Sequence, residues 1–184
     1  MGETKRIYIL LIRSNSMLSR IIHFITRAGY THASLGFSED CEQLYSFARR
    51  YIHIPFPVCF MNENIHKGFL GKNPKVPCAL YYADIPVEIY EKLHERVLRM
   101  LDEKKEYGYN YLGLLSCLFG IAWERQKKYF CSEFVAEALK ETNALPIEKS
   151  PSLVRPVDFQ KLSQLNLVYE GTISGLRNQI VSTV

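Results

Sequence analysis

The spacing of apolar residues predicts strands in the first part of the chain. Residues 6–12 are almost continuously apolar, which is typical of a buried strand. Residues 31–37 alternate between a large apolar face and a face that carries His32 and small residues, so they predict a second strand. Residues 43–48 predict a third strand, which would pair with the second as a hairpin across turn residues 38–40.

The other periodic segments favour helices. A helix is predicted to begin at the N-cap cluster of residues 14–16 and to end at Gly29. Three further helices are predicted over residues 89–101, 111–123 and 131–141. Two further strands are predicted over residues 78–83 and 165–169. The pattern indicates an α+β fold. Residues 1–184 have the length and apolar content of one domain, 47% of them being hydrophobic.

The segment from residue 52 to residue 77 interrupts this regular pattern. It holds four of the eight prolines and two glycines, which favours irregular structure. Long irregular segments are often functional, so we expect a covering loop here.

Charge and cysteine content limit the class of protein. The net charge of +4 comes from scattered basic residues, so we expect no nucleic-acid partner. The five cysteines are odd in number and widely spaced, and the apolar run at residues 7–12 is too short for a signal sequence. We therefore expect reduced thiols and a cytoplasmic location. The apolar segment 107–123 falls short of the roughly 20 residues that span a membrane, so it predicts a buried or interfacial helix.

Cys131 is the candidate nucleophile. It begins a predicted helix, where unpaired backbone N–H groups and the positive end of the helix dipole favour a thiolate. The apolar stripe of that helix turns the thiol toward the sheet. The alternative is a buried structural cysteine.

His32 is the candidate general base. Its neighbours Ser34 and Gly36 are small, so this face of the strand can lie beneath a closely packed helix, where an imidazole shares a proton with a thiol. A histidine of the core or the surface is the alternative. The remaining histidines are predicted to be surface residues or loop anchors, at positions 23, 53, 66 and 94.

Two motifs together resemble a known family. Residues 29–36 (GYTHASLG) look like the histidine strand, and residues 129–134 (YFCSEF) look like the nucleophile helix, of circularly permuted papain-like hydrolases of the NlpC-type superfamily, the YiiX and YaeF group. The histidine precedes the cysteine, as in the permuted members. The resemblance covers most of residues 6–142. It implies a permuted papain-like α+β fold, with a small antiparallel sheet packed against the nucleophile helix.

The resemblance also implies a third polar residue, which orients the imidazole from the strand after the histidine strand. Ser46 occupies that place in this sequence. A serine hydroxyl orients an imidazole but does not balance its charge, and Glu42 and Gln43 are nearby substitutes. Reduced or lost activity is therefore left open.

Substrate contacts are predicted near the nucleophile. The resemblance suggests that Tyr109 or Tyr111 supplies a phenol there, and Tyr45 is a further candidate for substrate binding. The backbone N–H groups of Cys131 and Ser132 are expected to bind the oxyanion. No metal-ligand spacing and no glycine-rich phosphate loop is present in the sequence, so we expect no metal and no cofactor.

The resemblance implies a thiol hydrolase, an amidase or peptidase. It would cleave amide bonds of small peptides or cell-wall-derived fragments through Cys131, His32 and an acyl-enzyme intermediate. The expected partner is a small peptide or amide substrate, and membrane contact is not favoured. The first alternative is an acyltransferase or lipid hydrolase resembling relatives of lecithin–retinol acyltransferase. The second is a non-catalytic binding module of the same fold.

Overall fold

The computed structural model describes residues 2–13, 29–49 and 57–183. The helix predicted from residue 14 to Gly29 falls almost entirely outside the described residues, as do His23 and His53.

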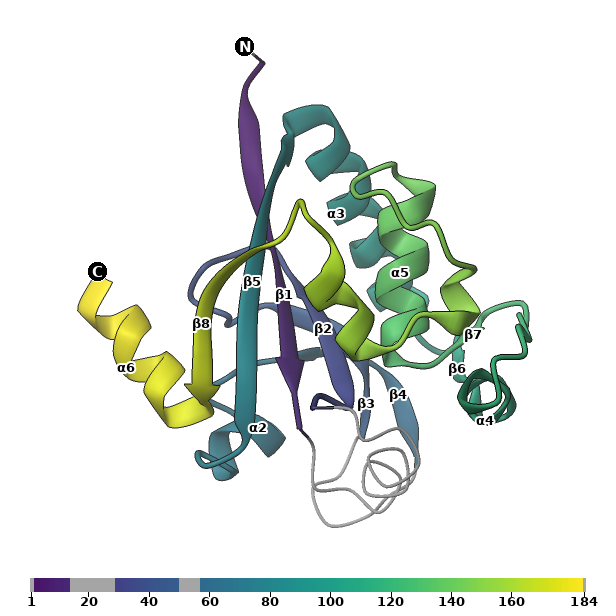
Figure 1. The fold of residues 1–184 in the computed structure, drawn as a ribbon, viewed down its shortest axis with the longest axis horizontal. Coiled ribbons are helices and arrows are strands. Elements are labelled where there is room, and N and C mark those ends of the chain that lie inside the picture. Colours follow the sequence, from purple (N-terminus) through teal and green to yellow (C-terminus); the bar gives the residue numbers. More distant parts are fainter. Residues whose placement is uncertain (1, 14–28, 50–56, 184) are drawn as a thin grey trace.

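Six strands form one antiparallel sheet in the order β4-β3-β2-β1-β5-β8 (Figure 1). Their bounds are Thr4–Ile12 (β1), His32–Gly36 (β2), Leu44–Arg49 (β3), Val58–Glu63 (β4), Pro77–Pro86 (β5) and Asn166–Thr172 (β8). All five strands predicted from the sequence are confirmed, and so is the hairpin pairing of β2 with β3. Strand β1 lies inside the sheet, which explains its continuous apolar run.

Helices cover both faces of this sheet. Helices α3 (Val87–Asp102) and α5 (Cys131–Glu141) pack on one face, and α2 (Gly68–Lys72) and α6 (Ile173–Thr183) lie on the other (Figure 1). The predicted helices 89–101 and 131–141 correspond to α3 and α5. The arrangement confirms an α+β fold in which the helix of Cys131 packs on an antiparallel sheet.

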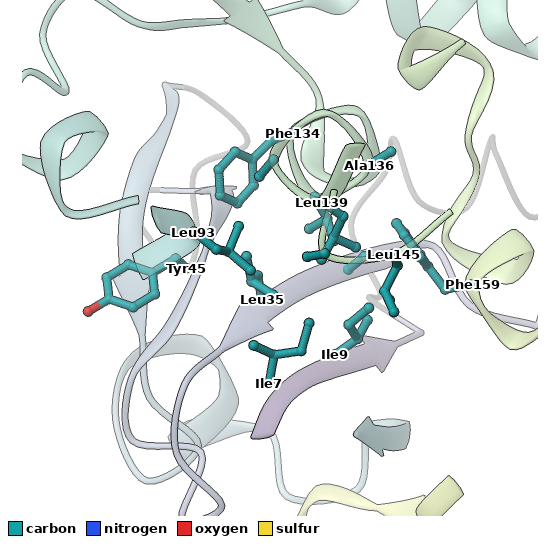
Figure 2. Close-up of a cluster of buried hydrophobic side chains, with 14 of the residues drawn as sticks. Ile7, Ile9, Leu35, Tyr45, Leu93, Phe134, Ala136, Leu139, Leu145 and Phe159 are labelled. Carbon is teal, nitrogen blue, oxygen red and sulfur yellow. The ribbon is translucent and has the colours of Figure 1, made fainter. Parts of the chain in front are cut away.

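The larger core lies between the sheet and helix α5. Figure 2 shows Ile9 of β1 and Leu35 of β2 pointing toward Phe134 and Leu139 of the helix. All four side chains are almost fully buried. Burial of one such side chain contributes about 1.5–3 kcal/mol, so this layer fixes the position of α5 on the strands.

Smaller elements surround the start of helix α5. Helix α4 (Tyr111–Leu118) precedes it, and strands β6 (Gly108–Tyr109) and β7 (Lys128–Tyr129) pair in parallel. Two short 3-10 helices follow α5, η1 (Pro151–Leu153) and η2 (Pro156–Lys161). No helix in the described part of the chain is both long and apolar enough to cross a membrane.

The structure corrects the prediction of an irregular segment over residues 52–77. Strand β4 and helix α2 lie within it, while residues 52–56 are outside the described part. The proline content favoured irregular structure in the prediction, but Pro57 precedes β4 and Pro77 is the first residue of β5. A strand tolerates proline at both of these positions.

The predicted helix over residues 111–123 is also too long. Helix α4 ends at Leu118, because Gly120 adopts a left-handed conformation with φ of 74°.

Candidate functional site

Cys131 is the first residue of α5, and its side chain is almost buried. The sequence begins a helix here because the Glu133 carboxylate accepts a hydrogen bond from the Phe130 backbone N–H at 3.1 Å, which caps the first turn. Asn110 supports the cap, since its side-chain amide donates to both carboxylate oxygens of Glu133. The thiol therefore lies at the positive end of a well-anchored helix.

The imidazole of His32 lies close enough to the Cys131 thiol for the two side chains to interact, and this interaction acts to raise the pKa of His32. The two residues meet where their elements begin, since His32 is the first residue of β2. The face of β2 beneath α5 carries Ala33 and Leu35, so the expectation that the small-residue face lies under the helix is wrong. The pair forms at the end of the strand instead.

Glu63, the last residue of β4, holds the opposite side of the imidazole. Its Oε2 lies 2.9 Å from His32 Nε2 and accepts a 2.7 Å hydrogen bond from Ser34 Oγ. Ser34 Oγ also lies 3.2 Å from His32 Nε2. Because Nε2 faces Glu63, Nδ1 is the ring nitrogen left for the thiol.

The electrostatic interaction between His32 and Glu63 favours the ionised form of both side chains. Burial lowers the pKa of His32, but the charge of Glu63 and the contact with Cys131 outweigh it and raise that pKa to about 10. Burial acts to raise the pKa of Glu63, yet the charge and hydrogen bond of His32 and the bond from Ser34 lower it overall. The site therefore holds an imidazolium and a carboxylate at neutral pH.

Ser46 is not the third residue of the site, which corrects the sequence prediction. Its hydroxyl is fully buried and donates to the Ala33 carbonyl at 2.7 Å, so it ties β3 to β2. The suggested substitutes Glu42 and Gln43 are exposed. Glu63 was missed because it belongs to the segment interpreted as an irregular loop. An acidic residue two positions after the apolar run at residues 58–61 was the available signal.

A pocket opens beside the thiol. Together with its open mouth it takes in about 420 Å³ of empty space. Its lining is mainly apolar and aromatic, and it includes Cys131 and Arg155; the other lining residues are Tyr30, Thr31, Tyr109, Leu114, Cys117, Leu118, Phe130, Ser132 and Pro156.

The three predicted tyrosines lie in different places. Tyr109 lines the pocket, and burial, helped by the neighbouring Cys131, raises its pKa well above the usual value, so it stays a neutral phenol. Tyr111 packs its ring 4.6 Å from that of Tyr109 but is partly exposed outside the pocket lining. Tyr45 is buried in the core against Phe37, so its prediction as a substrate-binding residue is wrong.

The predicted oxyanion donors both lie at the pocket. Cys131 and Ser132 are the first two residues of α5, so their backbone N–H groups have no acceptor within the helix. The Ser132 hydroxyl is engaged elsewhere, donating to the Val154 carbonyl at 2.7 Å. Ser132 can therefore bind an oxyanion through its backbone N–H but not through its hydroxyl.

Within residues 2–13, 29–49 and 57–183, no group of three or more His, Cys, Asp or Glu side chains is arranged to hold a metal ion. In comparisons with known proteins, no family model and no curated protein matches the chain.

Proposed function

We propose that the protein is a cysteine hydrolase of circularly permuted papain-like fold that cleaves amide bonds of small peptides or related acyl compounds. The observation that carries this proposal is the row formed by Cys131, His32 and Glu63. Hydrolysis by a cysteine nucleophile uses three groups: a thiol, an imidazole beside it and a polar group that orients the imidazole. Here they are a thiol at a helix N-terminus, the adjacent His32 ring and the carboxylate of Glu63.

The mechanism follows from the positions of these groups. The Cys131 thiolate attacks the substrate carbonyl, and the N–H groups of Cys131 and Ser132 stabilise the oxyanion. The His32 imidazolium then gives its proton to the leaving amine as the carbon–nitrogen bond breaks. Water next attacks the thioester, with neutral His32 accepting its proton, and the acid product leaves as the thiolate is restored.

Glu63 supports catalysis over the non-catalytic alternative. A buried carboxylate is costly unless it is paired, and this one is paired with the His32 ring, whose orientation and positive charge it stabilises. A carboxylate in this place keeps a proton on His32 beside the thiol, which the proposed mechanism requires.

Competitive alkylation tests the proposal. The five cysteines are labelled with limiting iodoacetamide between pH 5 and pH 9, and each site is quantified by mass spectrometry. At pH 6, where ordinary thiols are almost fully protonated, Cys131 should react about tenfold faster than the other four. His32→Ala should remove most of this advantage.

His66→Ala is the matched control, because His66 is exposed and lies outside the site. This variant should label like the wild type. If Cys131 reacts no faster than the other four cysteines, the proposed nucleophile is wrong.

A second candidate function is hydrolysis or transfer of lipid acyl esters. It is favoured by an exposed apolar patch on α4 and the residues after it, next to the pocket: Tyr111, Leu112, Leu115, Phe119, Ile121 and Trp123. Turnover of matched ester and amide substrates with the same acyl group separates the two functions. A hydrolase of small amides should turn over short water-soluble acyl amides, whereas a lipid enzyme should require long acyl chains.

A further inference from the structure

Arg155 brings a positive charge into the pocket of Cys131. It directly precedes η2, and its backbone N–H donates to the Asp158 carboxylate at 3.0 Å. The backbone of Arg155 is therefore fixed, and its side chain lines the same cavity as the thiol and the phenol of Tyr109.

No carboxylate neutralises this guanidinium among the residues that the structure describes. The Oδ1 atom of Asp158 is engaged by Lys149 at 3.2 Å and by Lys161 at 3.7 Å. Other carboxylates near the pocket are also engaged: Glu133 by Phe130 and Asn110, Glu63 by His32, and Glu170 by Tyr30. The segments outside the described part, residues 14–28 and 50–56, contain no Asp or Glu in their sequence.

The side-chain partner of Arg155 is a thiol. The guanidinium lies close enough to Cys117, which also lines the pocket, to act on the pKa of that thiol. Burial keeps the pKa of Cys117 above its ordinary value despite this contact, so the thiol is neutral and leaves the charge of Arg155 uncompensated. Guanidinium groups close to a mostly apolar wall attract anions strongly, because little water competes there.

We propose that Arg155 binds a carboxylate of the substrate. The planar guanidinium matches a carboxylate with two parallel hydrogen bonds, which a neutral amide cannot reproduce. This inference rests on the proposed function and narrows its substrate class: acyl compounds that carry a free carboxylate near the carbonyl attacked by Cys131, such as the acidic side chain or C-terminus of a short peptide.

Paired alkylating reagents test the inference without a known substrate. Iodoacetate and 3-iodopropionate carry a carboxylate at two distances from the reacting carbon, and iodoacetamide and 3-iodopropionamide are their neutral counterparts. For each pair, the ratio of acid to amide rate at Cys131 is divided by the same ratio at the half-buried Cys59 of the same chain. The Cys59 reference removes the intrinsic difference between the reagents.

For at least one reagent pair, the normalised acid-to-amide ratio at Cys131 should be about tenfold higher in the wild type than in Arg155→Gln. Any effect of this variant on the thiol itself changes the acid and amide rates at Cys131 by the same factor and cancels in the ratio. Arg99→Gln, which removes a positive charge from the exposed face of α3, should keep the wild-type ratio.

The outcomes distinguish the two proposals. Fast alkylation of Cys131 by the amides, with equal acid-to-amide ratios in wild type and Arg155→Gln, would overturn carboxylate binding while leaving the nucleophile intact. Slow alkylation of Cys131 by every reagent would overturn the proposed function itself.

Discussion

Glu63 and His32 form an ion pair in a place where neither group is well hydrated. The pair matters for reactivity because the proton on His32 is what stabilises a thiolate at Cys131. The property of Glu63 to test is therefore its negative charge, rather than its ability to accept a hydrogen bond.

Glu63→Gln should lower the pKa of His32 by more than about one unit, since it removes the largest influence that raises it. The ring resonances of His32 in nuclear magnetic resonance spectra should then titrate at a lower pH than in the wild type. Alkylation of Cys131 at pH 6 should slow in parallel. Ser46→Ala should leave the titration unchanged, and an equal shift in this variant would contradict the assignment of Glu63.

The same substitution should change stability in a pH-dependent way. The pKa of His32 is raised on folding, so its stabilisation is complete below about pH 6.5 and disappears as the pH rises through about 10. The pKa of Glu63 is lowered, so its share is lost in acid below its ordinary value of 4.5. The loss of unfolding free energy in Glu63→Gln, about 3 kcal/mol, should be largest near pH 5–6.

At the scale of elements, the first turn of α5 carries both the nucleophile and a buried carboxylate. Burial raises the pKa of Glu133 to about 7, although the hydrogen bonds from Phe130 and Asn110 oppose the shift. A carboxyl group with a raised pKa in the folded state binds protons more tightly than in the unfolded state. The fold should therefore lose stability as the pH rises from about 4.5 to 7.

Glu133→Gln should remove this pH dependence, because the amide oxygen still caps the Phe130 N–H but carries no charge. Urea unfolding at pH 5 and pH 8 measures the effect. The difference in unfolding free energy between the two pH values should shrink by about 1–2 kcal/mol relative to the wild type. Glu141→Gln, at the exposed end of the same helix, is the control and should leave the difference unchanged.

The elements show where sequence reasoning works. The strands and the helices α3 and α5, which have regular apolar spacing, were predicted with nearly correct bounds, and so was the position of Cys131 at the start of α5. His32 was predicted inside a strand that begins at residue 31, whereas it is the first residue of β2. Glu63 and Arg155 could not be found in this way. Glu63 reaches His32 across β3 through a tertiary pairing, and Arg155 enters the pocket from a short 3-10 segment without apolar periodicity.

Across the whole molecule, one part of the surface is unusually apolar. Leu115, Phe119 and Ile121 are 54%, 72% and 60% exposed, and residues 107–123 contain no charged side chain. After Glu124, cationic residues follow at positions 125, 127 and 128. An apolar surface with an aromatic residue and flanking cations is typical of proteins that lie on anionic membranes.

A lipid-directed enzyme should therefore float with vesicles of phosphatidylcholine and phosphatidylglycerol. In that case the double variant Leu115→Gln and Phe119→Ser should bind about tenfold less, because it removes two large exposed apolar side chains beside the pocket. Val181→Gln is the matched control, since Val181 is 72% exposed on α6. Wild-type protein that stays in the unbound fraction would count against the lipid function and leave the amide function in place.

The strand order also sets when the reactive groups become available during synthesis. His32, Ser34 and Glu63 all lie on the strands from β2 to β4, which together with β1 form one side of the sheet from the first 63 residues. Cys131 arrives on a later helix that needs this sheet to pack against. A nascent chain can therefore assemble the acid–base half of the site well before it contains the thiol, so the reactive pair is completed only after α5 has been synthesised and has packed on the sheet.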